Sequence, residues 1–289
     1  MNHSSVLILD EDVRSELWQH LIGAVEDYAN NVNKARVAPE LDLEKLRSLL
    51  KPFKFDRPVD PMEAVDFVVQ GLWQYQVHTP HPRYFGLFNP APTTMGIAAD
   101  MLVAAFNPQL AAWSHSPLSV EIEQHLVRAF GERFGLNPSQ TDGTFASGGA
   151  EANHTAMLTA LVQKFPKFSQ TGMRGLEAQP VLYVSNQSHH SFLKAARFCG
   201  LGTDAVREIS VNEDFQMDVE FLASQIKRDR RAGFAPFMIN ATAGTTIAGI
   251  VDPIATIADV AQDENLWLHI DAAWGGAACL VPELRTVLD

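Results

Sequence analysis

The second half of the sequence alternates short apolar runs with helical patterns, and this alternation limits the possible folds more than any other feature. Runs with the length and the residue types of strands occur at residues 181–184, 206–209, 237–239 and 266–270. Amphipathic helical patterns lie between them, starting near Ser191 and covering residues 219–230 and 254–262. A regular alternation of strands and helices predicts an α/β domain with a mainly parallel sheet and crossover helices.

Polar residues follow the ends of three of these predicted strands. NQSHHS (186–191) follows the first and NATAGTT (240–246) follows the third, while Asp271 ends the fourth, within LWLHIDAAWGG (266–276). The carboxyl ends of parallel strands meet at one edge of the sheet, where open α/β sheets bind their ligands. Each segment alone fits a turn, a helix cap or a packed histidine. Their shared position favours one binding site.

A second candidate site lies at the start of a predicted helix. DGTFASGGAEANHTAMLTALV (142–162) runs from small residues through Gly148 and Gly149 into a helix that begins near Glu151. The free N–H groups and the dipole of a helix start attract an anion, and glycine lets a phosphate approach the backbone closely. Glycine pairs at helix starts are often only turns. The motif therefore predicts a phosphate site only together with the strand ends.

The first 80 residues have a different pattern. Apolar residues at helical spacing predict helices within residues 12–50 and over residues 62–75, with three prolines between the two segments. These helices have no core of their own, so we expect residues 1–80 to form a helical N-terminal arm that packs on a neighbour. A partner subunit is the expected neighbour, which predicts a homodimer. Residues 81–289 then form the large ligand-binding domain.

Two segments follow the arm. TPHPRYFGLFNPAPTT (79–94) contains four prolines, which exclude a regular helix, and predicts a rigid loop that is either a surface connection or a pocket wall. Residues 119–134 have the pattern of an amphipathic helix. The apolar side chains expected to face inward from it are Val120, Ile122, Leu126, Val127, Phe130 and Phe134.

Charge and composition narrow the possible partners. The formal net charge of -12 argues against a nucleic-acid or anionic-membrane surface, because both require clustered Lys and Arg. A small-molecule ligand is expected instead. The two cysteines have the spacing of neither a disulfide framework nor a metal site, so we expect no metal and a reducing, cytoplasmic location. No apolar segment of the sequence reaches the length of a membrane span.

One cofactor fits a phosphate cradle, a flat imidazole, a hydroxyl group and a carboxylate in one site. Pyridoxal 5'-phosphate has a phosphate for the helix start, a ring on which His can stack, and a pyridine nitrogen that an Asp keeps protonated. HPRYF, SGGAEAN, NQSHHS, NATAGTTIAGIVDPI and LHIDAAWGG occur here in this order. Together they resemble the group II pyridoxal-phosphate-dependent decarboxylases, which act on aromatic amino acids, glutamate or 2,4-diaminobutyrate.

The resemblance implies a fold and a set of cofactor contacts. The fold is the large domain of the type I pyridoxal-phosphate-dependent transferases, which is similar to aspartate aminotransferase. Gly149 and Ala150 match the backbone that binds the phosphate, and Thr242 matches a hydroxyl-bearing cofactor contact. Asp271 matches the partner of the pyridine nitrogen, with Ala273 packed close to the ring. His189 matches the stacked imidazole, with His190, or neither histidine, as the alternative.

The same resemblance implies a Schiff-base lysine a few tens of residues after the DAA element, in a His-Lys motif. The sequence has no His-Lys dipeptide and ends at Asp289. We therefore expect an amino-terminal portion, truncated before the small C-terminal domain and inactive by itself. The intact enzyme is expected to decarboxylate an L-amino acid to the amine and CO2. An aminotransferase, a carbon–carbon lyase, or a non-catalytic fragment that binds or dimerises are the alternatives.

The choice of substrate depends on the proline-rich loop. Residues 84–89 match a family segment that lines the substrate pocket, and Leu87 and Phe88 give it an apolar lining. Glutamate decarboxylases resemble HPRYF closely but continue with polar residues where this chain has Gly86, Leu87 and Phe88. The difference disfavours glutamate and leaves an aromatic or another amino acid open.

Overall fold

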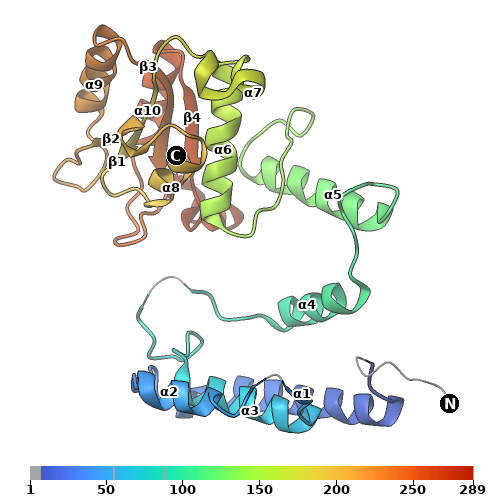
Figure 1. Ribbon diagram of the computed structural model, residues 1–289. Coiled ribbons are helices and arrows are strands. Elements are labelled where there is room, and N and C mark those ends of the chain that lie inside the picture. Colours follow the sequence, from blue (N-terminus) through green and yellow to red (C-terminus); the bar gives the residue numbers. More distant parts are fainter. Residues whose placement is uncertain (1–7, 55, 87–88, 289) are drawn as a thin grey trace. The chain divides into compact units, whose positions relative to one another are not determined.

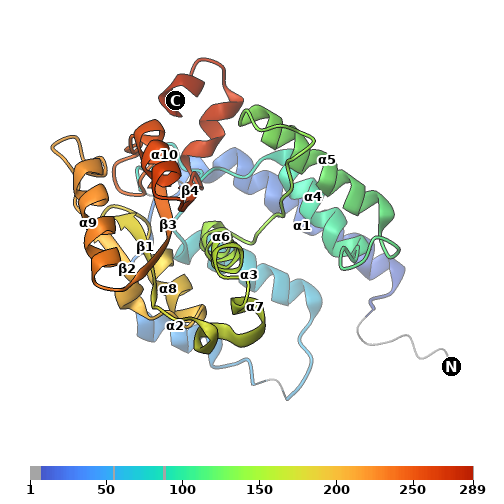
Figure 2. The same ribbon diagram turned by 90° about the horizontal axis from the view of Figure 1, so that it is seen from above.

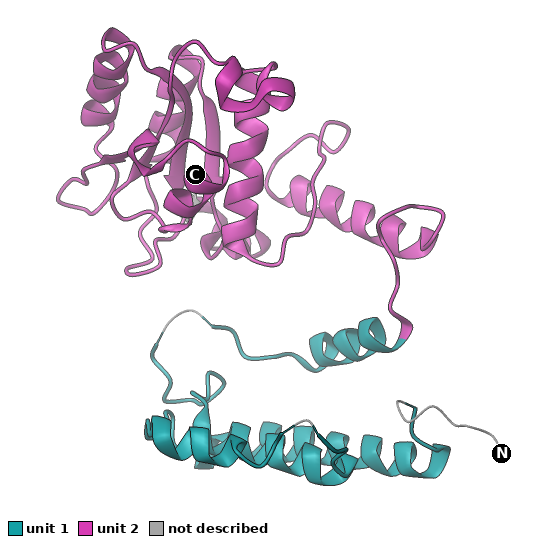
Figure 3. Ribbon diagram, viewed as in Figure 1, with its two compact units in different colours: residues 1–105 teal, residues 106–289 magenta. Residues whose placement is uncertain are grey.

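The computed structural model describes residues 8–54, 56–86 and 89–288. The chain divides into two compact units, residues 1–105 and residues 106–289 (Figure 3). Unit 1 contains α1 (Glu11–Asn31), η1 (Val32–Lys34), α2 (Leu43–Leu50), α3 (Pro61–Tyr75) and α4 (Thr94–Phe106), whose last residue lies across the boundary. The expected helical N-terminal region is therefore present. Leu87 and Phe88 lie outside the described residues.

Local capping explains where two helices of unit 1 begin. The Asp42 carboxylate accepts the N–H of Lys45 before α2, and Asp60 accepts the N–H groups of Met62 and Glu63 before α3. Pro61 is the first residue of α3, where its missing N–H costs no intrahelical bond. The described residues of the proline-rich loop, 79–86 and 89–93, form no helix or strand, as expected. The sequence did not predict α4, which follows it at once.

Unit 1 has a small core. Among its described residues, the buried apolar side chains are Leu17 and Val32. Tyr28 joins α1 to the end of α3, because its hydroxyl lies 3.0 Å from Nδ1 of the buried His78 and its ring meets Trp73 edge-on. The other ring nitrogen of His78 lies 3.1 Å from the Trp73 carbonyl oxygen. Much of the apolar surface of these helices stays uncovered.

Unit 2 contains a four-stranded parallel sheet (Figure 1). Its strands are β1 (Pro180–Ser185), β2 (Val206–Ile209), β3 (Ala235–Thr242) and β4 (Trp267–Asp271), in the order β2-β1-β3-β4. The chain passes from β1 to β2 on one side and then returns to β3 on the other side of β1. The strand order reverses between β1 and β3, and such a switch point is where α/β sheets bind ligands.

Helices cover both faces of this sheet (Figures 1 and 2). One apolar cluster joins the sheet to α6 (Gly149–Lys164) and α8 (Ser191–Phe198). A second cluster, on the opposite face, joins it to α9 (Val219–Arg231) and α10 (Ile254–Asp263). The remaining elements of the unit are α5 (Pro117–Arg133), α7 (Phe168–Thr171), η2 (Gly172–Gly175), η3 (Thr203–Ala205), η4 (Gly275–Leu280) and η5 (Arg285–Leu288). The three-layer α/β architecture expected from the alternation is confirmed.

The inward face expected for residues 119–134 is wrong at four of its six side chains, because Leu126 and three others are exposed, whereas Val120 and Val127 are half-buried. Ile122 is 50% exposed, Phe130 37% and Phe134 46%. The amphipathic pattern predicted the helix correctly, but a pattern contains no information about which segment covers the apolar side. Among the described residues, α5 makes no extended contact with another helix or strand.

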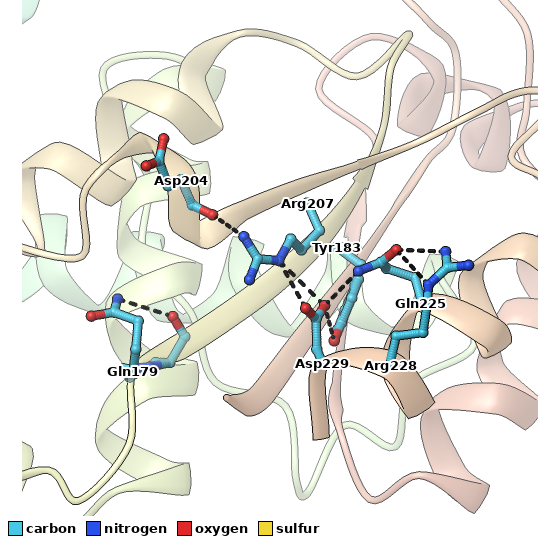
Figure 4. A network of polar contacts seen from close by, with 8 residues as sticks. Gln179, Tyr183, Asp204, Arg207, Gln225, Arg228 and Asp229 are labelled. Carbon is cyan, nitrogen blue, oxygen red and sulfur yellow. Dashed lines mark hydrogen bonds and ion pairs between the residues drawn. The ribbon is translucent and has the colours of Figure 1, made fainter. Parts of the chain in front are cut away.

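A buried polar network fixes α9 to the sheet (Figure 4). Asp229 of α9 accepts hydrogen bonds from the Tyr183 hydroxyl at 3.0 Å and from Gln225 Nε2 at 3.1 Å. Arg207 of β2 pairs with the same carboxylate at 3.2 Å, and its guanidinium lies over the Phe234 ring. Burial and the Asp229 charge raise the pKa of Tyr183, so its hydroxyl stays protonated and donates.

Among the described residues, no helix is both long enough and apolar enough to cross a bilayer.

Candidate active site

The candidate site is built on the carboxyl ends of β3 and β4. Thr242 and Asp271 are direct register partners across these strands, and Asn240 and His269 are the pair before them. Residues two apart on a strand point to the same face, so these four side chains form a polar layer at one edge of an otherwise apolar sheet. Thr242 and Asp271 are buried, with exposed fractions of 4% and 7%.

Two donors hold the Asp271 carboxylate. Its Oδ1 accepts the backbone N–H of Ala273 at 3.2 Å, which is possible because the chain turns directly after β4. Its Oδ2 accepts Nδ2 of Asn153, a buried residue of α6, at 2.8 Å. Each carboxylate oxygen has two lone pairs, so these contacts leave acceptor capacity for a ligand.

The start of α6 lies against the turn that follows β4. A Cβ atom added to Gly149 would lie 2.9 Å from the Ala273 Cβ, closer than side-chain carbons normally approach. The N–H groups of Glu151 and Ala152 bond to the Gly148 carbonyl oxygen. Among the described residues, the N–H groups of Gly149 and Ala150 meet no acceptor. This helix start therefore presents two backbone N–H donors next to the turn that follows Asp271.

An acidic residue sits in the first turn of α6 without blocking these N–H groups. The Glu151 carboxylate accepts the backbone N–H and the hydroxyl of Ser147, at 2.7 and 2.6 Å. These two hydrogen bonds lower the pKa of Glu151. The contact turns the carboxylate back towards Ser147.

His189 follows β1 at the same edge of the sheet. It is partly buried, and its Nδ1 accepts the backbone N–H of Ser191 at 3.3 Å. Burial and the neighbouring His190 lower the pKa of His189, while the Asp271 carboxylate raises it. His190 is exposed, and its ring centroid lies 4.2 Å from that of His189. Of the two histidines, His189 is the one whose environment includes Asp271.

A hydroxyl cluster crosses the switch point between β1 and β3. The Ser188 and Thr242 hydroxyl oxygens lie 3.0 Å apart, and Asn240 Nδ2 donates to Ser188 Oγ at 3.2 Å. The backbone of Thr242 is fixed from behind by Asp252, which accepts its N–H at 2.8 Å and the N–H of Met217 at 2.8 Å. Burial raises the pKa of Asp252. Thr242 is thus held from both its backbone and its side chain.

The structure brings together six of the predicted site residues, all in unit 2: Gly149, Ala150, His189, Thr242, Asp271 and Ala273. Sequence reasoning assigned no role to Asn153, Ser188, Asn240 or His269, although the motifs that it singled out contain all four. Position alone signals two of these, because Asn153 is one turn before the buried Met157 of α6 and His269 is two residues before Asp271 on β4. Among the described residues, no group of three or more His, Cys, Asp or Glu side chains is arranged to hold a metal.

These residues fit a ligand with an anionic group at one end and a protonated ring nitrogen at the other. The helix N–H groups of Gly149 and Ala150 suit a phosphate, and the absence of a Cβ at Gly149 lets Ala273 and the turn after β4 pack close to this helix start. The remaining lone pairs of Asp271 suit a pyridinium N–H. Both ends of the expected cofactor therefore find partners of the right chemistry.

Comparisons with known proteins find similar sequences and structures over most of this chain. The cysteine sulfinic acid decarboxylase of Rattus norvegicus is 36% identical over 215 residues, which are 74% of this chain and 43% of that protein. The crystal structure of mouse CSAD in apo form matches 97% of this chain and 59% of that chain, with 32% identity and a TM-score of 0.89. The structure of Oryza sativa TDC with PLP and tryptamine matches 97% of this chain and 61% of that chain, with 25% identity and a TM-score of 0.88.

The chain thus spans 43% to 61% of the length of these relatives. The model of the pyridoxal-dependent decarboxylase conserved domain matches residues 44–289. That range covers α2 to η5 and includes every predicted site residue. The resemblance drawn from the sequence motifs is confirmed: the chain belongs to the pyridoxal-dependent decarboxylase family.

Proposed function

We propose that the whole protein, of which this chain supplies the cofactor-binding residues, decarboxylates an L-amino acid to the amine and CO2 with pyridoxal 5'-phosphate as its cofactor. One observation carries the proposal: Asp271, with lone pairs left for a ligand, lies beside the N–H groups at the start of α6. Bound pyridoxal phosphate supplies a ring that accepts the electrons left on the substrate when CO2 departs. The residues of the chain bind and orient that ring.

In this proposal the two ends of the site have different tasks. The backbone N–H groups of Gly149 and Ala150 bind the phosphate, and the helix dipole adds to the attraction. Asp271 accepts a hydrogen bond from the ring nitrogen and keeps it protonated, because a carboxylate stabilises a neighbouring cation. Ala273 closes the site next to Gly149, and its small side chain leaves space for the ring.

Two further side chains complete the cofactor site in the proposal. His189 stacks on the ring, and its lowered pKa keeps the imidazole neutral at physiological pH, which avoids placing a second positive charge beside the pyridinium. Thr242 offers its hydroxyl to the cofactor, in competition with Ser188. His189 and Asp271 are the residues to which we assign a catalytic part.

The substrate is an amino acid. Leu87 and Phe88, proposed to line the substrate pocket, lie outside the described residues. The names of similar proteins supply candidates for assay: cysteine sulfinic acid, 2,4-diaminobutyrate and the amino acid that yields tryptamine. Glutamate remains disfavoured by the apolar residues in the loop.

One observation favours a second reaction on the same fold, in which the product is an aldehyde and not an amine. A structure named as Rhodiola rosea 4-hydroxyphenylacetaldehyde synthase matches 97% of this chain with 25% identity and a TM-score of 0.84. Proteins of this architecture therefore include one that is named for an aldehyde product. Product analysis separates the two reactions, since a decarboxylase releases an amine.

We also propose a homodimer in which unit 1 covers a second copy of the chain. The helices α1 and α3 line an apolar groove, and several of the large side chains in it are exposed. These side chains are Val25, which is 42% exposed, Val68, 54%, and Leu72, 50%. Exposed apolar surfaces of this kind mark sites of association.

We also propose a cytoplasmic location. The two free cysteines, Cys199 and Cys279, support it.

The test of the function uses the protein expressed from its gene, purified with pyridoxal phosphate. The candidate amino acids are supplied with a labelled α-carboxylate, and both CO2 and the organic product are measured. The expected result is CO2 together with the amine, and loss of both when Asp271 is replaced by Ala. CO2 with an aldehyde and ammonia, formed with consumption of dissolved O2 as the two-electron oxidant, would favour the second reaction. Turnover retained in Asp271→Ala would refute the role of Asp271.

A further inference from the structure

We propose that Asn153 is a positioning residue that orients the Asp271 carboxylate towards the cofactor ring, with His269 fixing the orientation of Asn153. The inference rests on the proposed function, because it assigns how the partner of the ring nitrogen is held. Asn153 lies on α6, four residues after Gly149, whereas Asp271 and His269 lie on β4. The three side chains contact one another between α6 and the end of β4, next to the sheet edge at which the cofactor is proposed to bind.

The Asn153 side chain uses both of its N–H donors in this place. Its Nδ2 lies 2.8 Å from Asp271 Oδ2 and 2.9 Å from Ser191 Oγ, and its Oδ1 lies 2.8 Å from His269 Nε2. Asn153 is 3% exposed and Ser191 is 1% exposed, so water does not compete for these contacts. A charge-assisted hydrogen bond in such surroundings holds the carboxylate in one rotamer.

His269 determines which way the Asn153 amide points. The amide oxygen only accepts hydrogen bonds, so the His269 nitrogen that faces it must carry the proton. Burial lowers the pKa of His269, which keeps the ring neutral, with a single N–H. That N–H occupies the amide oxygen and directs the amide NH2 group towards Asp271. Hydrogen bonds therefore run in one direction, from His269 through Asn153 to the carboxylate.

Because the hydrogen bonds run from His269 through Asn153 to Asp271, the lone pairs of the carboxylate that remain for a ligand are defined. Asn153 takes a lone pair of Oδ2, and the Ala273 N–H takes a lone pair of Oδ1. With both oxygens tied to rigid elements, the carboxylate cannot rotate to follow a ligand. The ring nitrogen must then approach along the lone pairs that remain, and such fixed geometry distinguishes a positioned acceptor from a mobile one.

The alternative is a purely structural role in docking α6 on the sheet. Asn153 continues the buried stripe of Met157, Ala160 and Leu161, so its loss could act through packing alone. Met157 provides the matched control, because it lies one turn further along the same stripe and is 0% exposed. Met157→Ala disturbs the packing of α6 without removing a hydrogen bond to Asp271.

The experiment compares two ligands in the protein expressed from its gene. Pyridoxal phosphate and its 1-deaza analogue, in which carbon replaces the ring nitrogen, are titrated against wild type, Asn153→Ala, Met157→Ala and Asp271→Ala. Dissociation constants come from fluorescence quenching. Circular dichroism confirms that each variant is folded. Selective ¹⁵N labelling of histidine reports the protonated nitrogen of His269 in the same proteins.

Wild type should bind pyridoxal phosphate more tightly than the analogue, and Asn153→Ala should reduce that preference about tenfold, as expected for a hydrogen bond to a charged group. Met157→Ala should weaken both ligands equally and keep the preference. The His269 Nε2–H form should dominate in wild type and lose its dominance in Asn153→Ala.

Two results would overturn the inference by itself: a preference that Asp271→Ala removes but Asn153→Ala keeps, or a His269 ring protonated on Nδ1 in wild type. A wild-type protein that does not distinguish the two ligands would instead refute the proposed role of Asp271, and the inference with it.

Discussion

Gly149 gives the sharpest test of the donor site at the start of α6. A methyl group at this position would lie 2.9 Å from the Ala273 Cβ, about 0.5 Å short of an ordinary carbon contact. The turn after β4 must then move away from α6. Overpacking of this size costs about 1–3 kcal/mol, while replacing Gly by Ala returns about 0.4–1 kcal/mol through the unfolded chain. Gly149→Ala should therefore lower the free energy of unfolding by about 1 kcal/mol, the difference between these two terms ranging from about 0 to 2.6 kcal/mol.

Two partner variants separate this contact from a general effect of losing glycine. Gly148 has no neighbouring atom within 4 Å of an added Cβ, and its backbone is extended, with φ 169°, so Gly148→Ala should cost little. Replacing Ala273 by Gly in the Gly149→Ala background removes the colliding atom and should restore both stability and affinity for pyridoxal phosphate.

The assays are urea unfolding and cofactor titration of the four proteins. If Gly149→Ala and Gly148→Ala behave alike, or if Ala273→Gly fails to rescue, the close approach of α6 to the turn does not shape the site. If Gly149→Ala binds pyridoxal phosphate more weakly but keeps its free energy of unfolding, the added methyl group contacts the cofactor and not Ala273.

Three further predictions concern other parts of the chain. Burial lowers the pKa of His269 below the reference value of 6.5, so the unfolded chain binds more protons and the free energy of unfolding falls as the pH drops below 6.5. His269→Gln should make the free energy of unfolding, measured by urea titration, depend less on pH in this range. An unchanged dependence on pH would contradict this prediction. Tyr183→Phe should lower the free energy of unfolding by about 1 kcal/mol, and Asp229→Ala should lower it by about 3 kcal/mol. The loss is larger for Asp229→Ala because it leaves both Arg207 and the Tyr183 hydroxyl without their shared partner. Equal losses for the two variants in urea unfolding would argue against the network. Val68→Lys places a charge in the apolar groove of unit 1, so the variant should sediment as a monomer where the wild type sediments as a dimer. A variant that still sediments as a dimer would show that the groove is not the dimer interface.

The sheet was predictable because its signal is local. The alternation of apolar runs and helical patterns identified all four strands, and the bounds of β2 agree exactly with the expected residues 206–209. The expected third strand was too short: β3 continues to Thr242. Its polar residues Asn240 and Thr242 resemble a turn in sequence, yet they are buried in the strand because they pair with the polar layer of β4.

The contacts that complete the site depend on tertiary packing and could not be predicted. The position of Asn153, one turn before Met157, places it on the inward side of α6, but its partners on β4 are known only once the helix is docked on the sheet. The same limit produced the error at α5, where the apolar side was found but not its cover. The motifs around Gly149, His189 and Asp271 indicated the cofactor through family resemblance. Their roles stay predictions until they are measured.

The most direct test of the central claim is the protonation state of the cofactor nitrogen. Pyridoxal phosphate labelled with ¹⁵N in the ring is bound to the protein expressed from its gene, and the nitrogen chemical shift is recorded by NMR near neutral pH. A carboxylate at hydrogen-bonding distance should keep that nitrogen protonated in wild type, and the Asp271→Ala variant should show the unprotonated shift. An unprotonated nitrogen in wild type, or the same shift in both proteins, would contradict the assignment of Asp271 as the partner of the ring.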